Sequence, residues 1–107
     1  MNLTLLKGYP DNIGRRKAFV GSGAGPTSYS QTTKDVLNMP LFGNYFDVVT
    51  GAATVSGTYI VRPIPSAASA RATWKLTWVV VATGAEVANG IDLSAERVLL
   101  SGFMGQY

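Results

Sequence analysis

Alternation of apolar and polar side chains in the segment 72–83 is the feature that most restricts the fold of this chain. The apolar positions that recur at every second residue are Trp74, Leu76, Trp78 and Val80. Residues two apart lie on one face of a β-strand, so this stripe predicts a strand that packs one face on a core. From Val79 the other face turns apolar as well, which predicts that the end of the strand is buried on both sides.

Four other segments carry the β-branched and aromatic residues that are typical of strands. They are 15–20, 45–50, 54–62 and 96–103, with a short hairpin at 83–88. We expect a turn at 51–53, a bulge at Gly57, and an end to pairing at 63–65, because proline lacks the amide hydrogen that a ladder needs. No window keeps helical periodicity beyond two turns. These features predict an all-β fold, a small antiparallel β-sandwich or β-barrel.

The length of 107 residues suits one domain with a single core. The sequence predicts a β-domain over 15–107, with a long loop at about 21–43 that starts in a glycine-rich stretch. Within this loop, only 33–38 has the composition of a helical turn. Residues 1–14 mix leucines with a proline and two glycines, which predicts an extended N-terminal arm ahead of the domain.

Histidine and cysteine are both absent, which excludes zinc fingers, thiol nucleophiles, Ser-His-Asp triads and disulfide scaffolds. Asp92 and Glu96 come closest to the carboxylate pair of a glycosidase. However, Asp92 stands where a carboxylate more often accepts backbone amide hydrogens in a turn. The stretch 21–25 lacks the Lys-Ser/Thr pair and the helix of a phosphate-binding loop. We therefore expect no enzyme activity, no cofactor and no metal site.

The charge balance permits an acidic partner. Nine Lys and Arg residues against six Asp and Glu give a net charge of +3. Dedicated nucleic-acid binders usually carry a denser basic patch, so nucleic acid is not the expected partner. The longest apolar run, 78–82, has five residues, against the roughly 20 of a membrane-spanning helix. We therefore expect no membrane partner.

The N-terminal arm and the basic triplet that follows it are the candidate contact site for a partner. The candidate residues are Leu3, Leu5, Leu6, Lys7, Tyr9, Arg15, Arg16 and Lys17. An apolar extended segment can add a strand to the open edge of a neighbouring subunit, while the triplet steers it towards an acidic rim. Two other interpretations stay open: the arm pairs within its own domain, and the triplet guards an edge strand against unwanted pairing.

Trp74 and Trp78 lie on one face of their strand and permit two interpretations. As a pair, they would form a stacking platform for sugar rings or bases. Core packing is favoured because Leu76 and Val80 share that face. Basic residues interleaved with aromatic ones elsewhere in the chain keep a binding module for single-stranded nucleic acid or carbohydrate as the alternative function.

Three features of the stretch 51–107 occur together. They are the Trp-x-Leu-x-Trp strand at 74–78, the Thr-Gly-Ala-Glu-Val hairpin at 83–87, and a composition rich in Gly, Ala, Ser and Thr without Cys or His. In these features the chain resembles the small virion structural proteins of tailed bacteriophages, above all the head-decoration (cement) proteins. The resemblance implies a β-barrel or sandwich on the outer capsid that joins major capsid subunits, with the arm 1–14 lying along the capsid.

The expected function is therefore that of a capsid decoration protein, made in the host cytoplasm and located in the virion. The expected partners are the major capsid protein or other virion subunits. Further copies of this chain are expected as well, because 47% hydrophobic residues with 14% charged residues exceed what one small core can bury.

Overall fold

The computed structural model describes residues 1–13, 16–67 and 72–106, and every regular element in these ranges is a β-strand. The strands are β1 (Thr4–Leu5), β2 (Asp11–Ile13), β3 (Arg16–Ala24), β4 (Asp35–Val36), β5 (Asn44–Thr54), β6 (Tyr59–Pro65), β7 (Trp74–Val80) and β8 (Arg97–Gln106). They form two antiparallel sheets packed around one core. The predicted all-β fold, a small antiparallel sandwich, is confirmed.

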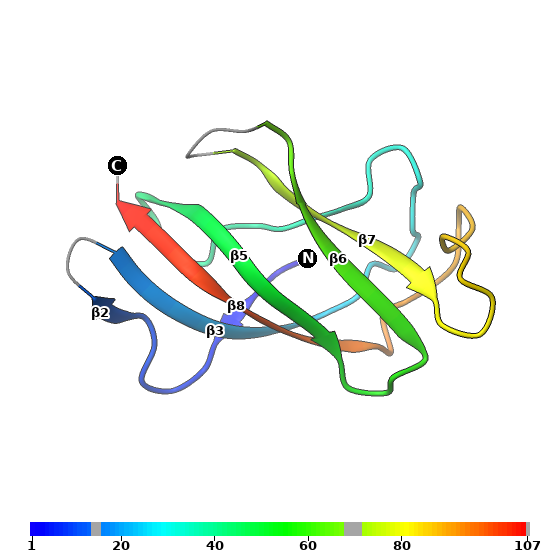
Figure 1. Cartoon of the computed structure of the whole chain (residues 1–107), viewed down its shortest axis with the longest axis horizontal. Helices are drawn as coiled ribbons and strands as arrows, with labels where there is room; N and C mark the ends of the chain where they lie inside the picture. Colours follow the sequence, from blue (N-terminus) through cyan, green and yellow to red (C-terminus); the bar gives the residue numbers. More distant parts are fainter. Residues whose placement is uncertain (14–15, 68–71, 107) are drawn as a thin grey trace.

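The larger sheet has five strands, in the order β1-β3-β8-β5, with β2 also paired to β3. β3 and β8 pair over eight residues, from Lys17 opposite Met104 to Ala24 opposite Arg97. β5 lies along the other side of β8 (Figure 1). β8 is thus the central strand of this sheet, because its neighbours hold both of its edges.

The smaller sheet has three strands in the order β4-β7-β6. β6 follows β5 in the chain, and the two strands, one from each sheet, lie next to each other (Figure 1). A parallel bridge between Asn2 and Asn38 links the opposite edges, close to β1 and β4. The two sheets therefore meet on both sides of the core.

The core contains the tryptophan stripe of β7. Leu76 and Trp78 are fully buried and Trp74 is 9% exposed, which confirms the predicted core stripe at these positions, while Val80 is half-buried. The stacking platform is therefore wrong, because both indole rings face the interior. The larger sheet packs Phe19, Phe46, Val98, Leu100 and Met104 against this stripe.

The first long strand extends beyond the end expected at Val20, because β3 continues to Ala24. Its glycines make room for the N-terminal residues. A β-carbon at Gly23 would lie 2.7 Å from the Met1 side chain and 2.8 Å from the Asn2 carbonyl oxygen. These glycines therefore admit a close neighbour and do not end the strand, so the loop begins after Ala24.

The hairpin between the sheets is also displaced from its expected place. Residues 51–53 lie within β5, which pairs with β8 through irregularities between Phe46 and Val48 and between Val49 and Gly51. The turn follows at 55–58, where Gly57 has a φ of 74°.

The expected end of pairing at 63–65 is wrong, since β6 includes both prolines. Pro63 lies opposite Leu76, and Pro65 lies opposite Trp74. β6 is the last strand of its sheet, and an edge strand tolerates proline because the missing donor can face away from the ladder.

The N-terminal arm runs along β3 of the same domain, in line with the open interpretation that it pairs within its own domain. Thr4 pairs with Ser22, and Asp11 pairs with Ala18. Leu3, only 8% exposed, joins the core. Within 33–38, where the composition permits a helical turn, β4 forms instead and pairs with β7.

Candidate docking surfaces

The arm residues expected to contact a partner are divided between interior and surface. Leu3 is buried and Leu5 is half-buried against the core. Leu6, Lys7 and Tyr9 are exposed in the connection between β1 and β2. The arm pairs with β3 of its own domain, which agrees with the interpretation that it pairs within its own domain.

The basic triplet is likewise divided. Arg16 forms an ion pair with Asp47, with Nε 2.9 Å from the carboxylate oxygen, and Lys17 lies half-buried in β3. Arg15 lies outside the described residues. Of the described triplet residues, Arg16 and Lys17 pair with β2 of the arm, and Arg16 is neutralised by Asp47.

Asp35 is the buried acidic residue of the described core, 3% exposed. One carboxylate oxygen lies 3.0 Å from the amino group of Met1, and the other accepts a hydrogen bond from Trp78 Nε1 at 3.0 Å. These contacts join the N-terminal segment, β4 and β7. Because both oxygens have partners inside the domain, the role of Asp35 is structural.

Tyr29 and Glu86 extend this polar cluster towards the surface. The Tyr29 hydroxyl donates to Glu86 at 2.8 Å and accepts from the backbone N–H of Trp78 at 3.2 Å. Burial raises the pKa of Tyr29 to about 12. The Lys34 ammonium, followed by the Tyr29 hydroxyl, holds the pKa of Glu86 below its usual range.

Asp92 has the geometry expected for a carboxylate that accepts backbone amide hydrogens in a turn, and not that of a glycosidase pair. Its carboxylate accepts the backbone N–H of Ser94 at 2.9 Å, and the hydrogen bonds of Ser94 lower its pKa. Glu96 instead accepts the hydroxyl of Ser56 at 2.6 Å. Each carboxylate thus stabilises a turn of its own.

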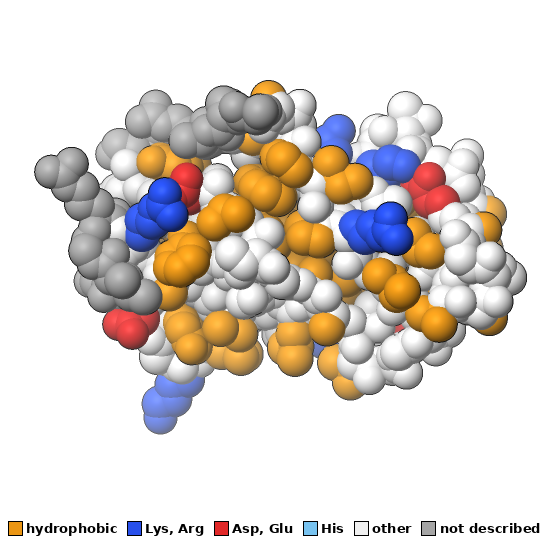
Figure 2. Space-filling view, viewed as in Figure 1, with side chains coloured by type: hydrophobic (Ala, Val, Ile, Leu, Met, Phe, Trp, Pro, Cys, Tyr) orange, Lys and Arg blue, Asp and Glu red, His pale blue; other side chains and the backbone are white. Residues whose placement is uncertain are grey.

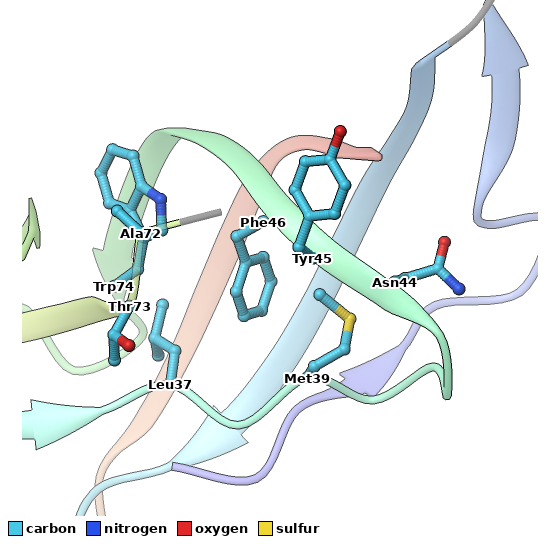
Figure 3. A pocket seen from close by; sticks show the side chains of 8 residues that line it. All are labelled: Leu37, Met39, Asn44, Tyr45, Phe46, Ala72, Thr73 and Trp74. Atoms are coloured by element: carbon cyan, nitrogen blue, oxygen red, sulfur yellow. The ribbon is translucent and has the colours of Figure 1, made fainter. Parts of the chain in front are cut away.

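A cavity of about 160 Å³ opens between the starts of β5 and β7 (Figure 3). Its lining residues are Leu37, Met39, Asn44, Tyr45, Phe46, Ala72, Thr73 and Trp74. Asn44 Oδ1 and Trp74 Nε1 are buried without a hydrogen-bond partner among the described residues. Figure 3 places these two side chains at opposite ends, with Phe46 between them and Asn44 pointing away from Trp74. They therefore do not converge on one group of a ligand.

The outer face of the larger sheet is almost free of charge. We call it the neutral face; it comprises Ala18, Val20, Ser22, Val48, Gly51, Ala53, Leu99, Ser101 and Phe103, which are cross-strand partners in three rows. Leu99 is 45% exposed. A hollow of about 420 Å³ lies where Gly51 and Ser101 present little or no side chain. When one face of an antiparallel sheet is in contact with solvent, the side chains on that face are normally polar. The neutral face is instead largely apolar.

The outer face of the smaller sheet combines apolar and basic side chains. We call it the basic face; it comprises Val36, Ile60, Arg62, Ile64, Lys75, Thr77 and Val79. Ile60 and Ile64, 48% and 45% exposed, stand on either side of Arg62 along β6. Lys75 lies opposite Ile64, diagonal to Arg62. Neither cation has an ion-pair partner among the described residues. The carboxylate at the edge of this face, Glu86, which bridges Val79, is already paired with Lys34.

Hydrophobic side chains cover much of one broad side of the molecule. Figure 2 shows them in several clusters that are separated by other side chains and backbone and by a few charged side chains. Isolated exposed apolar residues are ordinary on a soluble domain, whereas larger apolar patches are typical of interaction surfaces.

Neither face was identified from the sequence as a site. The signal that was available is the alternation of Ile60, Arg62 and Ile64 on the face opposite the buried Val61. Its meaning depends on the neighbouring strand, because only the pairing with β7 adds Lys75 to this face.

Comparison of the chain with protein-family models, with curated proteins and with solved structures found no match. Across 1–13, 16–67 and 72–106 there is no group of three or more acidic side chains placed to hold a metal ion. The same residues contain no helix with the length and apolar character needed to cross a membrane.

Proposed function

We propose that this protein is a non-enzymatic assembly protein that docks by its basic face onto an acidic protein surface. The observation that carries the proposal is the placement of Arg62 between the exposed Ile60 and Ile64, with Lys75 opposite Ile64 and neither cation paired among the described residues. The carboxylate at the edge of the face, Glu86, is already paired with Lys34. An interface draws affinity from an apolar centre and orientation from complementary charge. The basic face supplies both.

The apolar part of the face is large enough to contribute to binding. Ile60 and Ile64 are about half exposed, and complete burial of an isoleucine side chain is worth about 1.5–3 kcal/mol, so covering the exposed half contributes about 1 kcal/mol for each. Because β6 and β7 hold the two cations on a paired sheet, little ordering is needed on binding.

A protein surface suits this face better than single-stranded nucleic acid does. Binding of single strands relies on exposed aromatic rings on which bases stack. The aromatic residue of β6, Tyr59, turns inwards instead, with its ring centroid 5.8 Å from that of Trp78. The described members of the basic face are aliphatic or basic, with one threonine.

The resemblance of 51–107 to head-decoration proteins supports a virion as the location of the assembly. The partner that we propose is the outer surface of the major capsid protein, to which this chain adds contacts between neighbouring subunits. Such a partner must present carboxylates around an apolar patch if it is to complement Arg62 and Lys75.

Co-sedimentation with shells assembled from the major capsid protein of the source genome tests the proposal, and a source genome that encodes no such protein refutes the capsid as the partner. The double variant Arg62→Glu with Lys75→Glu is expected to weaken binding at least about 10-fold, since it replaces attraction with repulsion. Arg97→Glu, at the end of the neutral face, is the matched control and keeps its affinity for shells. Absence of co-sedimentation, or equal binding by the double variant, refutes the proposal. Tight binding of an oligothymidine with a steep salt dependence supports the nucleic-acid alternative in its place.

A further inference from the structure

We propose that the cavity between the starts of β5 and β7 binds a proline residue in an extended segment of a partner protein, and that a backbone carbonyl oxygen of this segment accepts a hydrogen bond from Trp74 Nε1. We call this site the Trp74 cavity; its lining residues are those given above. The inference rests on what the cavity requires in hydrogen bonding and packing, and it does not depend on what binds the basic face.

Trp74 brings a buried hydrogen-bond donor to the cavity without an acceptor. The residue is only 9% exposed, and its Nε1 has no hydrogen-bond partner among the described residues. Figure 3 shows this nitrogen on the edge of the indole ring that is turned towards Phe46. Trp78, on the same face of β7, differs because its Nε1 donates to Asp35 at 3.0 Å. An unpaired buried donor is costly, so the cavity favours an occupant that brings an acceptor.

The Trp74 cavity has a buried aromatic and aliphatic floor and an accessible rim. The floor residues are Leu37, Phe46 and Trp74, and the rim residues, half-buried or exposed, are Met39, Asn44, Tyr45, Ala72 and Thr73. None of these lining residues is charged, which favours a neutral occupant. The volume of about 160 Å³ is close to the roughly 150 Å³ of an engineered apolar cavity in another protein that binds benzene. One proline ring, slightly smaller than benzene, therefore fits.

Proline supplies the acceptor that the cavity lacks and adds no donor. Every other residue of an extended segment carries a backbone N–H that also needs a partner, whereas proline has only its carbonyl group. The unpartnered acceptor on the cavity wall is Asn44 Oδ1, and Figure 3 shows the Asn44 side chain pointing away from Trp74. An amide hydrogen placed beside Trp74 would therefore stay unpaired. Extended proline-containing segments also bind in grooves lined by aromatic rings, as Tyr45, Phe46 and Trp74 line this one.

Water is a poor competitor for this site. The side chains of the floor offer it one polar atom, Trp74 Nε1, whereas a buried water molecule typically makes about three hydrogen bonds. Replacement of poorly held water by an apolar ring favours binding. A segment in the polyproline conformation is extended before it binds, so little chain entropy is lost. Since the cavity takes one ring, the expected Kd is about 0.1–1 mM.

Nuclear magnetic resonance of the two indole N–H groups tests the proposal. The probe is an acetylated and amidated peptide of alternating alanine and proline. We expect it to shift the Trp74 indole signal in a saturable way, because this N–H gains an acceptor, while the Trp78 signal stays in place because Asp35 already holds it. The same peptide with valine in place of proline is expected to bind at least about 10-fold more weakly. An unmoved Trp74 signal at about 5 mM peptide, or equal binding of the two peptides, overturns the proposal.

Trp74→Phe keeps an aromatic ring and removes the N–H, and the signal that it abolishes assigns the Trp74 resonance. Followed through the backbone amide signal of Thr73, this variant is expected to bind the proline peptide at least about 3-fold more weakly. Val80→Ala is the matched control, because Val80 lies half-buried on the same face of β7 but outside the cavity; it keeps its affinity. Unchanged binding by Trp74→Phe, or equal weakening by Val80→Ala, contradicts the proposal. The comparison of the two peptides uses the unaltered chain, so it does not depend on the folding of either variant.

Discussion

Removal of the Asp35 carboxylate is expected to destabilise the fold more than removal of any exposed acidic group. The side chain is 3% exposed and holds two buried partners, the Met1 amino group and Trp78 Nε1, each at 3.0 Å. In Asp35→Ala the indole N–H loses its acceptor while it remains buried, and the ammonium group loses its counter-charge and keeps only the Val36 carbonyl oxygen as an acceptor. An unpaired buried charge of this kind costs about 3–5 kcal/mol.

The expected loss is large enough to measure by thermal and urea unfolding. For a domain of about 100 residues, 1 kcal/mol corresponds to a Tm change of about 4–8 °C, so Asp35→Ala is expected to lower the Tm by at least about 12 °C. Asp35→Asn is expected to lose less, because the amide oxygen still accepts from Trp78 Nε1 and only the charge is removed.

Asp47→Ala is the control, since it breaks an ion pair whose Arg16 side chain is 60% exposed. Exposed pairs of this kind contribute about 0–1 kcal/mol. If Asp35→Ala destabilises the domain no more than Asp47→Ala does, the buried carboxylate does not hold β4, β7 and the N-terminal segment together, and the reasoning is refuted.

Three further outcomes are expected. Leu3→Ala is expected to lower the free energy of unfolding in urea by about 2–5 kcal/mol, because Leu3 lies in the core. Leu6→Ala is expected to change it by less than about 0.5 kcal/mol, because Leu6 is 40% exposed. Equal effects of the two variants would show that Leu3 is not part of the core. Because burial raises the pKa of Tyr29 to about 12, the unfolded chain releases this proton first, so stability is constant up to about pH 10 and then falls by up to about 1.4 kcal/mol per pH unit as the pH rises. Urea unfolding at pH 9 to 11 measures this fall, and an unchanged slope in Tyr29→Phe would assign it to another group. Gly102→Ala is expected to cost about 1–3 kcal/mol, since a β-carbon there would collide with the Val48 carbonyl oxygen; an unchanged Tm would show that β5 can move aside.

Strand type and core orientation were predictable where side chains alternate. The stripe of Trp74, Leu76 and Trp78 follows from local geometry, because the face on which a strand residue lies depends only on whether its position is odd or even. The absence of helical periodicity likewise predicted an all-β fold. Prediction failed at glycines and prolines, because a glycine such as Gly23 can end a strand or admit a close neighbour, and only the packed Met1 distinguishes the two.

The docking surfaces depended on contacts between distant parts of the chain. The sequence by itself determined that Ile60, Arg62 and Ile64 share one face of a strand. Only the tertiary structure decided that this face is exposed, that Lys75 joins it, and that Leu3 is buried while β1 pairs with the edge of β3. The physical reason is that alternation assigns side chains to faces within one strand, whereas exposure and charge pairing are set by which strands pack against each other.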